Sequence, residues 1–541
     1  MAAVTVQHLK RRQSAMVAEK QLHEQVWKDC YDMTMPARAH GLMSEIISAT
    51  DAQQRKAIIY DSTAADSCKV GAASVMGAMV PSSVQWFDLD VGQTTDEESQ
   101  FLDEFSKFMW RNIHASNFDA ESMDAMLDSM IAGWFVLYVE EAEGGGYHCE
   151  TWPIGQCQIG STRPGGKVDT VSRKFTLTVA QVVANYGIDR VSQKVRESYE
   201  NEKFDDPVSL LLMIEPRAVY SAGPKTSQNM PFGSYHMELQ TQHILRESGY
   251  EEFPCSVPRW SRLPASSYAT GPMSDALADV RTLNEMVKWD LLGSETVIAP
   301  PMIAEDDGVL NPRNIKMGPR KIIVANSVDS MKPLVTGARV DIAEMKIARL
   351  QGNIRKILLA DQLPPADGPV KTAYEWSVRV DVMRKMLGPM FGRFQCEWLQ
   401  PLIERIFGIT WRANIRSGFT LIGRPPQSLL NRNFTVRYLN PLARAQRLED
   451  VAAMDRFELD IGTQAQAGMT DALDVYDWDA ARREKSKLLG VPQKLIRDAR
   501  QLKKARDERA QQQQAATQQA IAAQGQVATQ DAMAQRLATA A

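Results

Sequence analysis

Three stretches of this 541-residue sequence carry side chains that could do chemistry, and the first is glycine-rich with a lysine. Residues 160–168, GSTRPGGKV, are similar to a phosphate-binding loop. However, the spacing from Gly160 to the Gly166–Lys167 pair is one residue too long, and Val168 stands where a serine or threonine would bind magnesium. The stretch therefore predicts a β-turn and not a nucleotide site.

The second stretch contains His148, Cys149 and Cys157, which are residue types that bind zinc. No CxxC or HxxxH pair accompanies them, so no metal site is expected. The six cysteines are scattered, which in a chain of this size indicates reduced thiols: Cys30, Cys68, Cys149, Cys157, Cys255 and Cys396.

The third stretch, DVYDWD, places Asp474, Asp477 and Asp479 close together. These carboxylates could bind a cation, but acidic residues at the start of a helix are also favourable with its dipole. GxSxG and HExxH motifs are absent from the sequence.

Residues 482–509 form a basic segment in a chain whose formal net charge is −4. Eleven basic residues stand against four acidic ones (Glu484, Asp498, Asp507 and Glu508), a difference of +7. The basic residues are Arg482, Arg483, Lys485, Lys487, Lys494, Arg497, Arg500, Lys503, Lys504, Arg506 and Arg509. A patch of Arg497, Arg500, Lys503 and Lys504 could face DNA phosphates. The alternative is a solvated helix face with paired charges.

A long amphipathic helix is predicted over residues 371–409, because apolar residues recur there every three or four positions. These residues are Trp376, Val380, Met383, Leu387, Phe391, Phe394, Trp398, Leu402 and Ile406. Thr372 and Glu375 have the spacing of a capping box at its start. Pro389 lacks a backbone donor, so we expect a kink beside it, and Pro401 could add a second.

Two further amphipathic helices precede it, over residues 272–299 and 341–360. The segment between them, 300–340, is punctuated by proline and glycine and contains one good strand, KIIVAN. Residues 361–370, DQLPPADGPV, hold three prolines and a glycine, so they predict a stiff loop.

The whole pattern predicts an α+β fold that is mostly helical. Further helices are expected over residues 6–35, 58–80 and 97–131 and after a strand in NFTVRYLNP, while residues 133–262 read as β-rich with a helical insert near 179–186. The alanine- and glutamine-rich residues 507–541 are either a helix stabilised by assembly or a frayed tail. No apolar run reaches the roughly 18–20 residues that a membrane span needs, and the N-terminus is not a signal peptide.

The sequence resembles the head-to-tail connector, or portal, proteins of short-tailed bacteriophages. The resemblance spans roughly residues 1–500 and rests on ordered segments: the small-residue helix before VPSSVQWFDLD, then PRWSRLPASSYATGPMSDALADVRTLNEM, KTAYEWSVRVDVMRKMLGPMFGRFQCEWLQPLIERIF, YLNPLARAQR and LLGVPQKLIRDAR. The alanine- and glutamine-rich tail resembles the family least.

The resemblance implies a portal fold with wing, helical stem, clip, channel loop and a C-terminal helical crown or barrel. It divides this chain into a wing (1–270), a stem helix (271–299), a clip (300–340), a second stem helix (341–360), a channel loop (361–370), a long kinked helix with a return to the wing (371–440) and crown or barrel helices (441–541).

The resemblance also implies a virion protein, made in the host cytoplasm, that forms a ring of usually twelve copies at one capsid vertex. Double-stranded DNA would pass through the axial channel, without sequence-specific contacts, during packaging and ejection. The implied partners are other copies of the chain, terminase, tail adaptor or nozzle proteins, and capsid and scaffolding proteins, with no membrane. Catalysis, cofactors and metals are not implied, because terminase hydrolyses the ATP.

The expected DNA-facing residues lie in and beside the channel loop: Gln362, Pro364, Pro365, Asp367 and Lys371. The prolines would keep a constriction from collapsing, and the lysine could contact phosphates. The alternative is that the prolines only end the preceding helix and that Lys371 is solvated.

The helix 272–299 carries five acidic residues, Asp275, Asp279, Glu285, Asp290 and Glu295, against Arg281 and Lys288. If these acids line the channel, they would repel DNA and let it slide.

Two other functions of the protein remain open. A DNA-packaging enzyme, such as a terminase ATPase or nuclease, is disfavoured by the missing phosphate-binding loop, and another internal virion protein would form filaments, monomers or small oligomers instead of a closed ring.

Overall fold

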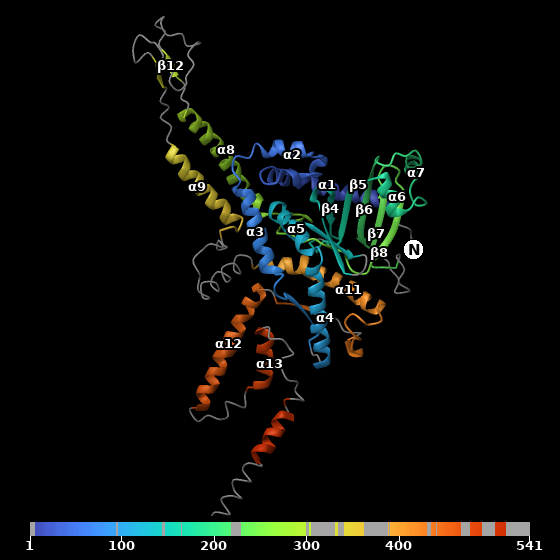
Figure 1. The fold of residues 1–541 in the computed structure, drawn as a ribbon, viewed down its shortest axis with the longest axis vertical. Coiled ribbons are helices and arrows are strands. Elements are labelled where there is room, and N and C mark those ends of the chain that lie inside the picture. The colour runs from blue at the N-terminus through green and yellow to red at the C-terminus, as the bar shows by residue number, and fades with distance from the viewer. Residues whose placement is uncertain are drawn as a thin grey trace, which may run out of the picture. The chain divides into compact units, whose positions relative to one another are not determined.

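The computed structural model describes residues 6–92, 96–142, 146–163, 165–217, 229–298, 302–304, 331–333, 340–361, 388, 390–429, 434–439, 441–466, 476–489, 502 and 504–514 (Figure 1). The chain forms two compact units. The first unit comprises Met1–Trp86 and Lys107–Gly423, and the second comprises Phe87–Ser106 and Arg424–Ala541. Both contain helices and strands, so the predicted α+β class is confirmed.

The α-helices of the first unit are α1 (Val6–Asp32), α2 (Ala49–Lys56), α3 (Thr63–Met79), α5 (Phe118–Ala132), α6 (Val179–Tyr186), α7 (Gln193–Glu200), α8 (Pro272–Ile298), α9 (Val340–Ile357) and α11 (Gln400–Arg416). Short 3₁₀ turns lie at Pro36–Ala39, Leu42–Ser44 and Ile154–Gln156, and a π-helical turn lies at Gln395–Leu399. The strands are β2 (Val136–Glu141), β3 (Tyr147–Trp152), β4 (Cys157–Gly160), β5 (Thr170–Thr178), β6 (Pro207–Pro216), β7 (Phe232–Glu238), β8 (Ile244–Tyr250), β9 (Cys255–Ser256), β10 (Ser261–Arg262), β11 (Ala269–Thr270), β12 (Met302–Ala304) and β13 (Met331–Pro333).

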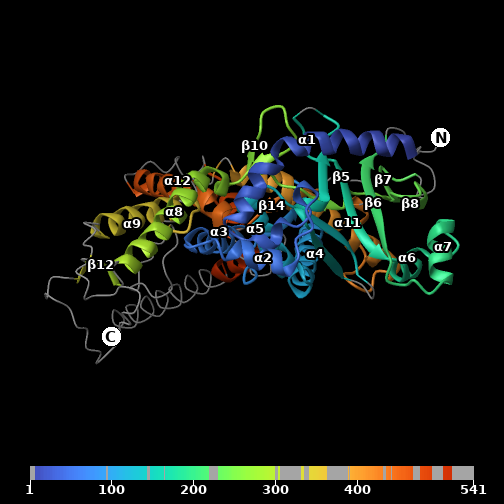
Figure 2. The same cartoon turned by 90° about the horizontal axis from the view of Figure 1, so that it is seen from above.

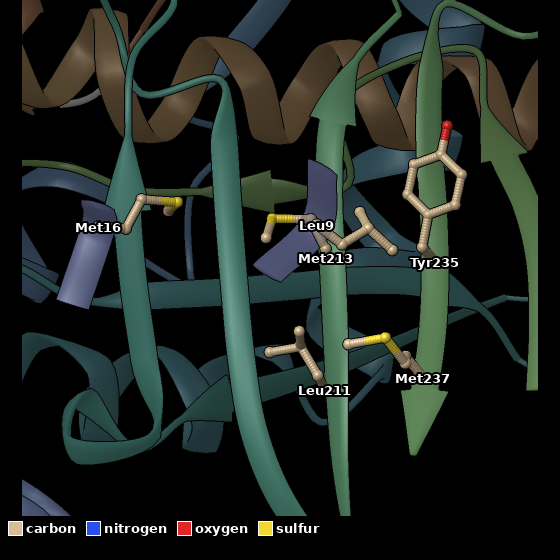
Figure 3. Close-up of a cluster of buried hydrophobic side chains, with 6 residues drawn as sticks. All are labelled: Leu9, Met16, Leu211, Met213, Tyr235 and Met237. Carbon is tan, nitrogen blue, oxygen red and sulfur yellow. The ribbon is translucent and has the colours of Figure 1, made fainter. Parts of the chain in front are cut away.

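A five-stranded antiparallel sheet, in the order β4-β5-β6-β7-β8, forms the largest β layer. Strand β6 is buried on both faces because helices cover both. On one face, α1 lies across the strands, as Figure 2 shows from above. Leu9 and Met16 of α1 pack there on Leu211, Met213 and two residues of β7, Tyr235 and Met237 (Figure 3).

The opposite face of the same sheet is covered by α6 and α7. Leu210 of β6 points to this side, since successive residues of a strand face opposite ways. It joins Val182, Val195 and Leu245 in a second buried cluster. Helix α6 has the bounds expected for the helical insert, whereas α7 was not predicted.

A second sheet, β3-β2-β9, lies beside α5 and α11. Near it, the rings of Trp27, Trp134 and Tyr268 pack together with centroids 5.3–5.5 Å apart. All three side chains are buried, so α1 is joined to the segments that flank this sheet.

The small-residue helix is shorter than predicted. Residues 58–80 were expected to be helical throughout, but α3 begins at Thr63, and the segment 57–62 is a loop. Close packing is present as expected. A Cβ on Gly71 would lie 2.5 Å from the carbonyl oxygen of Leu358, which follows α9, so only glycine fits here.

The long helix predicted over 371–409 is described from residue 390 onward, and it continues to Arg416. Phe391, Phe394, Trp398 and Leu402 are buried, so this half of the predicted stripe is confirmed. The other part of the predicted stripe lies outside the described residues: Trp376, Val380, Met383 and Leu387. Pro389 lies outside them as well. A π-helical turn at Gln395–Leu399 precedes Pro401, whose missing N–H interrupts the regular bonding.

The second unit contains β1 (Phe87–Asp90), paired antiparallel with β14 (Thr435–Tyr438), then α12 (Pro441–Gln466) and α13 (Trp478–Leu489). It also includes a 3₁₀ turn at Gln427–Leu429, a helical segment at 504–514 and the start of α4 (Asp96–Ala115). A cavity of about 580 Å³ between α12 and α13 is lined by Ala453, Met454, Phe457, Tyr476, Asp477, Ala480 and Ala481. This lining is largely apolar.

Candidate functional site

Helices α8 and α9 form an antiparallel pair that extends from the first unit and carries the two-stranded β12–β13 ladder at its far end (Figure 1). The ladder pairs Met302 with Pro333 and Ala304 with Met331. The predicted strand KIIVAN lies outside the described residues. The observed helix bounds are close to the 272–299 and 341–360 expected from the sequence, because the apolar periodicity is a local signal.

Asn284 fixes α8 to the body of the unit. Its side chain is buried, and its Oδ1 accepts the backbone N–H of Tyr60 at 2.7 Å. Its Nδ2 donates to the carbonyl of Ile58 at 3.1 Å. Sequence reasoning missed this residue, although a lone asparagine between apolar stripe residues was a usable signal.

The same loop also holds α9. The Gln351 side chain donates to Asp61 Oδ2 at 2.8 Å. Arg281 of α8 forms an ion pair of 2.7 Å with Asp29 of α1. The hairpin is therefore fixed to the unit by polar contacts from both of its helices, close to the point where it leaves the body.

The C-terminus of α9 is closed by its own backbone. Leu359 adopts a left-handed conformation with φ 62°, and its N–H donates to Lys356. Ala360 N–H donates to Arg355 at 2.8 Å, which completes a Schellman motif. Since α9 ends at Ile357, seven residues before Pro364, the helix does not need the proline pair to end it.

The predicted channel-loop residues Gln362, Pro364, Pro365, Asp367 and Lys371 lie outside the described residues. So do Arg497, Arg500 and Lys503 of the predicted basic patch. Lys504 is described and is exposed on the helical segment 504–514. Neither predicted DNA contact is tested by these observations, and both stay predictions.

Other cations of the basic segment have carboxylate partners. Lys485 pairs with Asp455 and, at 3.2 Å, with Glu458. Arg506 donates two hydrogen bonds, of 2.6 and 2.8 Å, to the carboxylate of Asp479. For Lys485 and Arg506, these contacts agree with the alternative interpretation of the basic segment, a helix face with paired charges.

Asp477 caps the start of α13. Asp477 Oδ1 accepts the backbone N–H groups of Asp479 and Ala480 at 3.1 and 3.0 Å. No group of three potential metal ligands occurs in the described part of the chain. The helix-start interpretation therefore applies to Asp477, and Asp474 lies outside the described residues.

The glycine-rich stretch forms the loop between β4 and β5. Gly166 N–H donates to the carbonyl of Arg163 at 2.9 Å, so the predicted β-turn is confirmed. Cys149 and Cys157 are buried, and burial raises the pKa of each thiol to about 12, while His148 is exposed. Protonated, buried thiols are poor metal ligands.

A buried ion pair holds the π-helical turn against this loop. Arg259 is 1% exposed and donates to Glu397 through Nη2 at 2.6 Å and Nε at 3.0 Å. The same Nη2 donates to the Gly166 carbonyl at 2.8 Å. No sequence signal identified this pair, because 138 residues separate its members.

Among the acids of α8, Glu285 pairs with Lys288 at 3.8 Å. Asp275, Asp279, Asp290 and Glu295 form no ion pair with any other residue that the structure describes. Among the described residues, the carboxylates of Asp290 and Glu295 on the outer part of α8 are therefore without an ion-pair partner. No helix within the described segments is long and apolar enough to span a bilayer.

Residues 6–496 match the family model described as bacteriophage head to tail connecting protein. The chain is 27% identical over 531 residues to the portal protein of Salmonella phage epsilon15, with 94% of this chain and 92% of that protein covered. It is 26% identical over 498 residues to a probable portal protein of Bordetella phage BPP-1, with 90% and 87% covered.

Two solved structures are also similar, each at 13% identity and a TM-score of 0.32. The first is titled "Neck of empty GTA particle computed with C6 symmetry", and the match covers 77% of this chain and 90% of that chain. The second is titled "Virion of native gene transfer agent (GTA) particle", and the match covers 80% of this chain and 94% of that chain. Because the family model matches most of its length, the chain belongs to the bacteriophage head to tail connecting proteins, the portal proteins at the capsid vertex of the virion.

Proposed function

We propose that twelve copies of this chain assemble into a closed ring whose axial channel conducts double-stranded DNA into the capsid and out again. The observation that carries the proposal is the α8–α9 hairpin, which Asn284 and Gln351 fix to the body of the first unit. A rigid, projecting helix pair is suited to form the wall of a tube when it is repeated around an axis.

The loop that follows α9 narrows this channel in the proposal. Its candidate DNA contacts are Gln362, Pro364, Pro365, Asp367 and Lys371, with Lys371 interacting with phosphates without reading bases. The Schellman motif at Leu359 supports the proposal, because it fixes the direction in which the chain leaves the helix. A basic patch of Arg497, Arg500, Lys503 and Lys504 is a second candidate for phosphate contact.

The ring also serves as a docking platform. In the proposal, terminase binds it during packaging, tail adaptor or nozzle proteins bind it later, and capsid and scaffolding proteins surround it. The segment 300–340 at the far end of the hairpin is the proposed clip that contacts terminase and tail. The chain itself has no catalytic role in this scheme.

Negative-stain electron microscopy and native mass spectrometry of the purified, nuclease-treated protein test the ring. Closed rings of about twelve subunits with a central hole are the expected result. Monomers or dimers that persist at high protein concentration would overturn the proposal. For the loop, Lys371→Ala should slow DNA packaging while rings persist, and unchanged packaging would remove Lys371 from the DNA contacts.

A further inference from the structure

The outward face of α8 carries a large apolar side chain that the described part of the chain leaves uncovered. Trp289 is 66% exposed. It lies nine residues after the buried Val280, about two and a half turns, and so points to the opposite side of the helix. An indole this exposed is unusual on a surface that faces only water.

The outward face of α9 has the same arrangement. Met345 is 70% exposed and lies nine residues before the buried Ile354, again about two and a half turns away. Ala348 and Gly352 follow on the same face, and a Cβ on Gly352 would meet nothing within 4 Å. Since Ala348 and Gly352 are small, they place no bulky side chain on this face beside Met345.

The two faces point away from each other. Val287 of α8 and Ile347 and Leu350 of α9 are half-buried, and they lie on the stripes of Val280 and Ile354. Helices α8 and α9 lie against each other, and the half-buried state of these positions beyond the body indicates that their stripes face one another. Trp289 and Met345 therefore lie on opposite outer sides of the hairpin, where one copy of the chain cannot bring them into contact.

The two side chains lie at matching heights along the hairpin. Asn284 and Gln351 mark one level, because both bind the loop that contains Tyr60 and Asp61. Trp289 is five residues beyond Asn284, about 7.5 Å, and Met345 is six residues from Gln351 in the same direction, about 9 Å. Rotation about an axis parallel to the hairpin keeps each height unchanged, so it brings Trp289 of one copy level with Met345 of the next.

Charges of opposite sign lie at matching heights as well. Asp279 precedes Asn284 by five residues and Lys356 follows Gln351 by five residues, so both lie nearer to the body than that level. Further out, Asp290 is next to Trp289 and Lys346 is next to Met345. These four residues form no ion pair with another described residue. The α8 edge is thus acidic where the α9 edge is basic, as two unlike surfaces that bind each other require.

We infer that α8 of one subunit docks on α9 of its neighbour, with Trp289 packed on Met345 and Gly352 and with Asp279 and Asp290 facing Lys356 and Lys346. The inference rests on the proposed ring and names the surfaces that close it. The contact is heterologous, because the two sides use different helices, and such a contact generates a ring when the rotation closes.

Disulfide trapping tests the contact in the full-length chain. Cys396 is the exposed cysteine, and the other five are buried, so Cys396→Ser gives a suitable background. In that background, Trp289→Cys combined with Met345→Cys should give a ladder of covalent multimers under mild oxidation. Each single-cysteine variant should stay monomeric on a denaturing gel, whereas a mixture of the two should give dimers.

The outcomes separate this contact from the ring itself. Rings seen by electron microscopy without a ladder would overturn the contact and leave the ring proposal intact. Dimers from a single-cysteine variant would also overturn it, because they show that like faces meet. If the parent chain forms no ring at all, the proposed function fails and this inference fails with it.

Charge exchange gives a second test without cysteines. Asp279→Lys should raise the protein concentration needed for ring formation by about tenfold, and adding Lys356→Asp should restore it. Glu295→Lys is the matched control, because this exposed acid of α8 is not among the four facing residues. If Asp279→Lys leaves ring formation unchanged but alters DNA packaging, Asp279 faces the channel and the inference is wrong.

Discussion

Arg259 and Glu397 form a buried ion pair, with Nη2–Oε1 at 2.6 Å and Nε–Oε2 at 3.0 Å. The pair joins the segment after β9 to the π-helical turn that leads into α11. Arg259 also donates to Gly166, so three distant segments of the chain meet at one guanidinium group. Such a group orders the structure only while all its partners are present.

Removal of this carboxylate should destabilise the first unit strongly. We expect Glu397→Ala to lower the free energy of unfolding by about 3–5 kcal/mol, because it leaves Arg259 buried without a counter-charge. Arg416→Ala is the control, since Arg416 pairs with Glu141 at an exposed site and should cost less than about 1 kcal/mol. Chemical denaturation followed by tryptophan fluorescence measures both. Equal losses would contradict the prediction.

Gly71 should not tolerate a larger residue. In Gly71→Ala the new Cβ would lie 2.5 Å from the Leu358 carbonyl oxygen and 2.7 Å from Met130, so we expect a loss of about 1–3 kcal/mol. Gly77→Ala in the same helix is the control, because its Cβ would meet nothing within 4 Å. It should be neutral or stabilise by up to about 1 kcal/mol. Hydrogen exchange at residues 354–361 should accelerate in the first variant alone.

Asn284 should be needed to hold the hairpin. Asn284→Ala leaves the backbone N–H of Tyr60 and the carbonyl of Ile58 without this partner, at a cost of about 1–3 kcal/mol. The control is Asn353→Ala, an exposed position on α9 that should change stability by less than about 0.5 kcal/mol. Faster hydrogen exchange in residues 57–62 would accompany the loss. Unchanged exchange there would argue against this role.

His236 should make the first unit less stable in mild acid. Burial lowers its pKa from 6.5 to about 4, and Arg246 repels the charged ring. Between these pH values the unfolded chain binds a proton that the folded chain does not, so this contribution to stability is present above pH 6.5 and is lost as the pH falls toward 4. The loss should reach up to about 3 kcal/mol.

The variant His236→Gln isolates this effect. The difference in unfolding free energy between parent and variant should shrink as the pH is lowered from 7 to 4, because only the parent has the titrating imidazole. Urea denaturation at several pH values measures that difference. A constant difference across the range would show that the protonation of His236 is not coupled to folding.

The sequence determined the elements whose signal is local. The apolar stripes of α8 and α9 each lie within one segment, and the observed bounds of these helices and of α6 are close to the predicted ones. Where local signals were weak, prediction failed. The start of α3 was placed too early, because Asp61 and Ser62, which are residue types that favour a helix start, were included in the predicted helix. Helix α7 was missed.

The tertiary structure alone decided which distant segments meet. Strand β1 pairs with β14, Asn284 binds the loop at Tyr60, and Arg259 meets Glu397, although hundreds of residues separate the members of some pairs. Hydrogen-bonding groups and charges carry no local periodicity that names their partners. Folding selects them because the buried polar groups must be satisfied once the apolar faces have packed. The solvent exposure of Trp289 and Met345 was likewise decided by the tertiary structure. It depends on which faces of α8 and α9 the rest of the unit covers.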